Sequence, residues 1–84
     1  MNILILEDEI PAYQKLTKGL DSFFDIKISH DWGRSIVDGE KFLKENTYDF
    51  ILSDIQLLDG TSFDLFNKIN TEIPIIFCSA HDEY

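Results

Sequence analysis

The chain contains three short runs of uninterrupted apolar residues and one run in which apolar and polar residues alternate. The uninterrupted runs are residues 3–6, 50–52 and 74–78. Runs of this length, rich in β-branched residues, are typical of strands that are buried on both faces of a sheet. The alternating run, residues 25–30, indicates a strand with one solvated face, which is expected at a sheet edge.

Three segments between these runs have apolar residues at three- and four-residue spacing, which predicts amphipathic helices. The first covers residues ~9–24, the second covers roughly 32–45, and the third follows Thr61-Ser62. Either Asp31 or Ser35 can cap the second helix, and Thr61-Ser62 can cap the third. The residues expected to lie on the apolar faces are Tyr13, Leu16, Leu20, Phe23, Phe24, Ile36, Gly39, Leu43, Phe63, Phe66 and Ile69.

Strands and helices therefore alternate along the chain, beginning and ending with a strand. Such alternation predicts the α/β class, with parallel strands, right-handed crossovers and helices on both faces of the sheet. The fully apolar strands belong in the middle and the half-polar second strand belongs at the edge, which gives the strand order 2-1-3-4. This order is flavodoxin-like, and such sheets carry their function at the carboxyl ends of strands one and three, where the order switches.

Length and composition are those of one packed domain. The chain has 84 residues, which allows a single domain, residues 1–84, and 44% of them are hydrophobic. It has no apolar run of about 18 residues, so no membrane span is expected, and residues 1–7 lack the basic start of a signal peptide. For its one cysteine, Cys78, burial as a small apolar residue is favoured over a reactive thiol. These features fit a reducing cytoplasm.

The charge and the motifs exclude several classes of function. Sixteen acidic residues against seven basic ones give a net charge of −9, which favours a cation or a basic partner surface. Because nucleic-acid backbones are bound through Lys and Arg, this segment itself is not expected to contact nucleic acid. No G-x-G-x-x-G motif follows a strand, which excludes a dinucleotide-binding enzyme at the motif level. Asp54-Ile55-Gln56 lacks the second acid of the D-x-D hydrolases.

Acidic side chains end the two strands that flank the predicted switch point. Glu7 and Asp8 end the first strand, and Asp54 ends the third. If both strands end level, the carboxylates converge, and two charges about 5 Å apart repel by roughly 3 kcal/mol at an effective dielectric constant of about 20. No lysine or arginine follows either strand end closely. The site must therefore retain a proton or bind a hard divalent cation such as Mg2+.

Each of these residues also has a simpler interpretation. Glu7 and Asp8 could stabilise the N-terminus of the following helix, and Asp54 could be a charge in a surface turn. Asp54 ends a buried strand with no helix immediately after it, so the joint pattern of acids at both strand ends favours a cation site. Ser79 follows the fourth strand and could contact a ligand on Asp54, although such a serine more often bonds a backbone group.

Three runs of the sequence, taken together, resemble a known family. They are ILILEDE, DFILSDIQLLDGTSFDLF and IPIIFCSAHDEY. These runs resemble the receiver domain of bacterial two-component response regulators, and the second and third look most like the receivers of LytTR-type regulators. The resemblance covers the whole chain. It implies a single, partial receiver domain that ends after the fourth strand.

The resemblance implies roles for residues at the two acidic strand ends and beyond them. Asp54 matches the phosphoacceptor, Asp8 the acid that contacts Mg2+ directly, and Glu7 the acid that usually acts through water. The backbone carbonyl of Gln56 matches the third protein ligand of the metal, and Ser79 matches the switch hydroxyl. The implied function is Mg2+-dependent phosphorylation of Asp54 by a sensor histidine kinase, in an acceptor module and not an enzyme. LytTR-type regulators carry a separate DNA-binding output domain, of which these residues show nothing.

The sequence also departs from the family pattern. The family often has Pro where Leu58 stands and Gly where Ser62 stands. The chain stops at Tyr84, before the fifth strand with its phosphate-contacting lysine and before the last two helices. We therefore expect the fourth strand, residues 75–78, to be an exposed apolar edge, completed in a homodimer or by exchange of elements with a second copy. The alternative function is a non-phosphorylated pseudo-receiver or dimerisation fragment.

Overall fold

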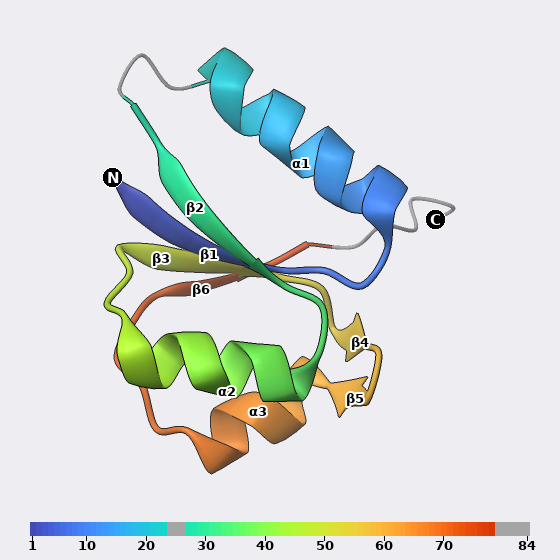
Figure 1. Ribbon diagram of the computed structural model, residues 1–84, viewed down its shortest axis with the longest axis vertical. Coiled ribbons are helices and arrows are strands. Elements are labelled where there is room, and N and C mark those ends of the chain that lie inside the picture. Colours follow the sequence, from blue (N-terminus) through green and yellow to red (C-terminus); the bar gives the residue numbers. More distant parts are fainter. Residues whose placement is uncertain (24–26, 79–84) are drawn as a thin grey trace.

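The computed structural model describes residues 1–23 and 27–78, which form a four-stranded sheet with helices packed against it (Figure 1). The strands of this sheet are β1 (Asn2–Leu6), β2 (Ser29–Gly33), β3 (Phe50–Ser53) and β6 (Ile75–Phe77), and the helices are α1 (Ile10–Phe23), α2 (Ile36–Glu45) and α3 (Ser62–Lys68). Two short strands, β4 (Gln56–Leu57) and β5 (Gly60–Thr61), form a separate antiparallel hairpin. Within the described ranges, no helix is both long enough and apolar enough to cross a membrane.

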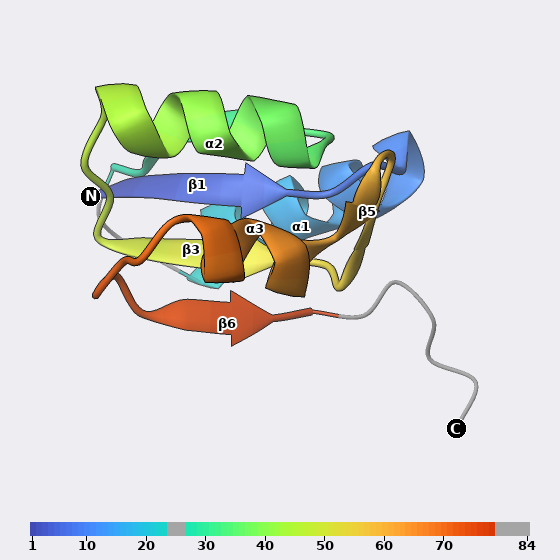
Figure 2. The ribbon, with the colours of Figure 1, turned by 90° about the horizontal axis from the view of Figure 1, so that it is seen from below.

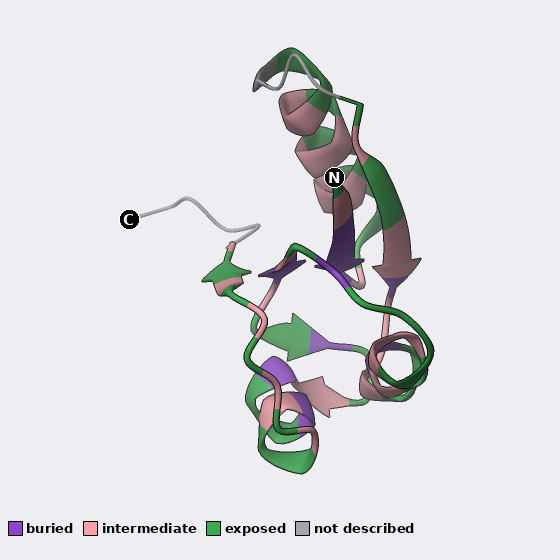
Figure 3. Cartoon of the chain, turned by 90° about the vertical axis from the view of Figure 1, so that its left-hand side faces the viewer, coloured by how far each residue is buried: buried purple, intermediate pink, exposed green. Residues whose placement is uncertain are grey.

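The sheet is parallel throughout, and its strand order is β2-β1-β3-β6. This confirms the predicted α/β class and the flavodoxin-like order 2-1-3-4, with β6 as the fourth strand. Figure 2 shows β1, β3 and β6 side by side and pointing the same way. Residues Ile3 to Leu6 of β1 have no exposed surface, as the uninterrupted apolar run predicts, whereas Ile76 and Phe77 at the β6 edge stay 50% and 44% exposed (Figure 3).

Helices cover both faces of the sheet, as predicted (Figure 1). On one face, α1 packs an apolar stripe against Ile3 and Ile5 of β1. On the other face, α2 and α3 pack over Leu4 and Leu6, the side chains that alternate with them. Because successive side chains of a strand point to opposite faces, β1 divides its apolar residues between two cores. That division is the physical reason why its sequence has no polar interruption.

β2 lies further along the chain than the pattern predicted. The alternating run predicted a strand over residues 25–30, the first part of which lies outside the described residues, but the strand observed is Ser29–Gly33. Asp31 lies within this strand, which is possible because an edge strand can expose polar side chains. The prediction that Asp31 can cap the next helix is therefore wrong. Ser35, the other predicted option, is the N-cap of α2, and its side chain accepts a hydrogen bond from the Asp38 amide at 3.0 Å.

α3 begins where the sequence predicted but presents a different face to the core. Thr61 is its N-cap, and Thr61 and Asp64 form a reciprocal capping box. Phe63 was expected to face inward, yet it is 49% exposed, and Leu65 occupies the fully buried position instead. The ring of Phe63 lies against that of Phe77 on β6, with centroids 5.2 Å apart. In so short a helix, the position of the cap determines which residues face the sheet. The spacing of the apolar residues alone did not show which face this would be.

The segment after β3 forms the β4–β5 hairpin, which the sequence pattern did not predict. Leu58 and Asp59 form the turn that connects its strands, and Gly60, the first residue of β5, adopts a φ of 147°, a conformation that favours glycine. The Asp59 carboxylate accepts hydrogen bonds from the backbone amides of Ile36 and Val37 at 2.6 and 3.3 Å. These amides are at the N-terminus of α2, where a negative charge is favourable. The turn is therefore fixed against α2.

Candidate functional site

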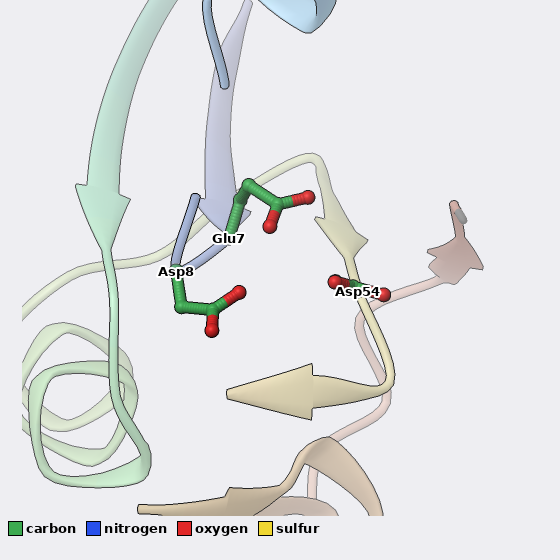
Figure 4. Close-up of side chains that lie close together, drawn as sticks. All are labelled: Glu7, Asp8 and Asp54. Atoms are coloured by element: carbon green, nitrogen blue, oxygen red, sulfur yellow. The ribbon is translucent and has the colours of Figure 1, made fainter. Parts of the chain in front are cut away.

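Three carboxylates meet at the carboxyl ends of β1 and β3 (Figure 4). Glu7 and Asp8 directly follow β1, and Asp54 directly follows β3. The strands end level because Leu6 pairs with Ser53, and the Asp54 amide donates to the Leu6 carbonyl at 2.8 Å. One oxygen from each of the three carboxylates lies within 4.8 Å of the others. The acids thus come together where the strand order switches, as level strand ends predict.

The three acids differ in exposure and in hydrogen bonding. Glu7 is only 1% exposed, and its carboxylate accepts a hydrogen bond from the Glu9 amide at 3.1 Å. Asp8 and Asp54 are half-buried. Oδ1 of Asp54 accepts from the Ile55 amide at 2.8 Å, and no donor from the described part of the chain bonds Oδ2. Asp54 therefore presents one carboxylate oxygen that a ligand or a reacting group can approach.

The pKa of the Glu7 carboxyl is raised from 4.5 to about 7. Burial is the main cause, because it penalises the charged form. The Glu9 amide opposes this shift by bonding the carboxylate, and the negative charges of Asp54 and Asp8 reinforce it. Without a metal ion, the site therefore reduces its internal repulsion by keeping a proton on Glu7 near neutral pH. This is one of the two solutions that the sequence left open.

The donor set also fits the other solution, a hard divalent cation. Mg2+ prefers oxygen ligands and usually binds one or two carboxylates while it keeps several waters. Asp8 and Asp54 are half-buried, so a partly hydrated ion can reach them, and Glu7 lies behind them as a third carboxylate. Gln56, whose backbone carbonyl is also a predicted ligand, is the first residue of β4 and follows Asp54 closely. Its role as a ligand stays a prediction.

Two further residues that the sequence singled out, Cys78 and Ser79, follow β6 along the chain. Ser79, the predicted switch hydroxyl, lies outside the described residues. Cys78 is half-buried, and its amide donates to the Ser53 carbonyl at 2.8 Å. Burial raises the pKa of the Cys78 thiol, and the charges of Asp54 and Glu7 raise it further. These surroundings disfavour the thiolate and favour the predicted packing role over a reactive thiol.

A basic residue that the sequence pattern did not indicate also lies at this site. No lysine or arginine follows the acids closely in the chain, but Arg34 reaches Asp8 from the end of β2. Its Nη2 and Nε atoms donate to the Asp8 backbone carbonyl at 2.7 and 3.2 Å. This contact could not be predicted from the sequence, because the second strand was expected to end at residue 30, four residues before Arg34. With β2 ending at Gly33, Arg34 emerges beside the carboxyl end of β1.

Comparisons with known proteins agree with this geometry. The chain is 38% identical over 93 residues to the sensory transduction protein LytR of Streptococcus mutans, a match that covers 100% of this chain and 36% of LytR. It is 31% identical over 86 residues to the swarming motility regulation protein RssB of Serratia marcescens, covering 98% of this chain and 37% of RssB. The solved non-phosphorylated HemR receiver domain of Leptospira biflexa aligns at 28% identity and a TM-score of 0.75, covering 95% of this chain and 64% of that one. The chain matches the receiver domain of response regulators.

This match confirms the resemblance to receiver domains that the three sequence runs indicated. The match supports a role as a module of two-component signalling. The flavodoxin-like strand order of this sheet agrees with that of the matched receiver domains. No family model matches the chain. The chain spans a little over a third of the length of the curated relatives, 36% of LytR and 37% of RssB.

Proposed function

We propose that this receiver domain accepts a phosphoryl group on Asp54 in a two-component phosphorelay. A sensor histidine kinase is the donor, and Mg2+ is held by Glu7, Asp8 and Asp54, with the backbone carbonyl of Gln56 as a further ligand. The observation that carries the proposal is the convergence of the three carboxylates within 4.8 Å, with Asp54 half-buried and accessible. The names of the relatives, a sensory transduction protein and a swarming motility regulation protein, support a signalling function.

The chemistry requires little more than positioning and charge neutralisation. A carboxylate oxygen of Asp54 forms a bond to the phosphorus of a phosphohistidine while the P–N bond breaks. The electrons of that bond and a proton go to the leaving imidazole, and the product is an acyl phosphate that water later hydrolyses. A bound Mg2+ supplies the positive charge that lowers repulsion between carboxylates and phosphoryl oxygens. Ser79, outside the described residues, is the proposed switch hydroxyl.

In the wider protein, the domain would act as a phosphate acceptor and not as an enzyme. We propose that it works in the cytoplasm and controls a downstream output, most simply transcription, through a domain outside these residues. The curated relatives are longer than this chain, which leaves room for such a domain. The net charge of −9 disfavours direct contact between this segment and nucleic acid.

The proposal is tested by incubating the protein with acetyl phosphate and MgCl2 and measuring its intact mass. One phosphoryl adduct is expected, and Asp54→Asn should abolish it completely because the amide is a poor nucleophile. Asp21→Asn, which removes an exposed acid of α1, is the matched control and should keep the adduct. Chelation of the metal should suppress adduct formation. A folded wild-type protein without an adduct, or an adduct that survives Asp54→Asn, would rule the proposal out.

A second candidate function is association through the edge of β6, by a non-phosphorylated pseudo-receiver or dimerisation fragment. In residues 1–23 and 27–78, no strand pairs with the outer side of β6, where Ile76 and Phe77 are half-exposed. Phe63 of α3 lies beside Phe77 and extends this apolar surface. Because exposed apolar edge strands favour pairing, we propose that a second copy of this chain binds there, as a homodimer or by exchange of elements.

Sedimentation velocity at micromolar concentrations tests this second function, and a concentration-dependent dimer is expected. Ile76→Lys should give a monomer under the same conditions, because a lysine on an edge strand disfavours pairing. Val37→Lys is the matched control: Val37 is 69% exposed on α2, away from β6, and its replacement should leave the dimer intact. A folded wild-type monomer at these concentrations would exclude association while leaving the phosphoacceptor proposal untouched.

A further inference from the structure

The junction between β2 and α2 contacts the acidic segment that follows β1. Trp32 of β2 donates its indole N–H to the Glu7 backbone carbonyl at 2.7 Å. Two residues later, Arg34 donates through Nη2 and Nε to the next carbonyl along the chain, that of Asp8, at 2.7 and 3.2 Å. Two successive carbonyls of the acidic segment are therefore held by side chains from one neighbouring strand end.

The same junction also contacts the segment that follows Asp54. The Arg34 backbone carbonyl accepts a hydrogen bond from the Leu58 amide at 3.2 Å. The amides of Ile36 and Val37 bind the Asp59 carboxylate, as described above. The junction thus lies between the two acidic segments and bonds both of them. Arg34 is the residue that takes part on both sides, through its side chain on one and its backbone on the other.

One peptide unit of the acidic segment is held at both of its polar ends. The Asp8 carbonyl and the Glu9 amide belong to the same planar unit. Arg34 binds the oxygen of this unit, and the Glu7 carboxylate accepts from its N–H at 3.1 Å. Rotation of this unit would turn the chain at Asp8. The double attachment opposes that rotation and so limits where the Asp8 carboxylate can point.

Arg34 is itself held in place before any ligand binds. Its guanidinium carbon lies 5.5 Å from the centroid of the Trp32 ring, within the range of a cation–π contact. The Trp32 ring is in turn held by Tyr13 of α1, whose ring stacks on it with centroids 3.8 Å apart and planes 4° from parallel. Arg34 is also the only arginine in the chain. No lysine could reproduce its two-donor contact, because an ammonium lacks the rigid planar fork.

We propose that Arg34 is a positioning residue for the acidic site: it fixes the Asp8–Glu9 peptide unit and thereby orients the Asp8 carboxylate for Mg2+. This inference rests on the proposed function, which gives the site its metal. Partners that orient metal ligands without touching the ion typically change metal affinity by about 10–100-fold when they are removed. Arg34 acts in this way through the backbone of Asp8, and its charge is secondary.

The decisive variant is Arg34→Lys, which keeps the positive charge but loses the fork. Its dissociation constant for Mg2+, measured by isothermal titration calorimetry on the whole chain, is expected to rise about tenfold. Lys41→Ala, which removes one positive charge from an exposed position of α2, is the matched control and should stay within about twofold of wild type. An unchanged affinity in Arg34→Lys would overturn the inference. So would tighter binding in Arg34→Ala, because Arg34 would then act as a competing charge.

A metal-free measurement separates this inference from the proposed function. Amide hydrogen exchange, followed by NMR without Mg2+, should be faster at Glu9 in Arg34→Lys and unchanged at Leu52 in β3. Equal acceleration at both amides would indicate general loss of stability and would count against positioning. If wild type failed to bind Mg2+ while Glu9 still exchanged faster in the variant, the metal site would fail and the positioning contact would stand.

Discussion

Glu7→Gln is expected to stabilise the metal-free domain at pH 8 by about 3 kcal/mol. The folded Glu7 carboxyl has a pKa raised from 4.5 to about 7, chiefly by burial. Between these two values the folded state holds a proton that the unfolded state has lost, so stability falls as pH rises through this window. Above pH 7 the charged carboxylate is buried at full cost, about 1.4 kcal/mol for each unit of the shift. A neutral amide of the same shape avoids that cost and can still accept from the Glu9 amide.

Urea denaturation at pH 5 and pH 8 without metal measures this effect. The stabilisation by Glu7→Gln should be large at pH 8 and small at pH 5, where wild-type Glu7 already carries its proton. Glu9→Gln is the matched control. It removes the same charge, but from an exposed side chain, two residues after Glu7 in the chain. It should change stability by no more than about 0.5 kcal/mol at either pH. Equal effects of Glu7→Gln at both pH values would show that proton retention on Glu7 is not what matters.

Gly39→Ala is expected to destabilise the domain by about 1–3 kcal/mol, although alanine is the better helix former by about 1 kcal/mol. A Cβ at Gly39 would lie 2.6 Å from Cδ2 of Leu65 and 3.2 Å from Cδ2 of Leu6. Both leucines are fully buried, so neither side chain has free space into which it can move. The absence of a side chain at Gly39 is therefore what lets α2 approach both β1 and α3.

The matched control is the same substitution in the other long helix. A Cβ at Gly19 of α1 would meet nothing within 4 Å. Gly19→Ala should therefore stabilise the domain by up to about 1 kcal/mol, through helix propensity alone. The two variants are expected to shift the urea midpoint in opposite directions. A stabilising Gly39→Ala would mean that α2 and α3 pack more loosely than the contacts indicate.

The strand order could be predicted from the sequence because burial on two faces leaves a clear pattern. Residues 3–6 and 50–52 are apolar without interruption, and both runs lie inside the sheet. The meeting of Glu7, Asp8 and Asp54 followed from the same reasoning, since parallel strands that end level bring their next residues together. The departures at Leu58 and Ser62 did not alter the fold: Leu58 is 64% exposed, and Ser62 starts α3 directly after the hairpin.

The features that sequence reasoning missed depend on contacts between distant segments. β2 lies at an edge, where polar residues are tolerated, so its pattern did not fix its ends. Phe63 was expected to be buried, but Leu65 is buried in its place, because the cap at Thr61 decides which side of α3 meets the sheet. The contact of Arg34 with Asp8 could be predicted only with the observed end of β2. No local pattern indicates a side chain that binds a backbone carbonyl 26 positions away.

The central place of β1 has a consequence for how the domain is made. β1 is synthesised before both of its hydrogen-bonded partners, which begin only at Ser29 and Phe50. Parallel strands cannot pair through a local turn, and the long intervening segments must close before burial of Ile3–Leu6 gives any gain. During synthesis, β1 therefore lacks at least one of its two partner strands until β3 has emerged. Until then, the apolar run Ile3–Leu6 is an aggregation-prone segment of the nascent chain, although it has no exposed surface in the folded domain.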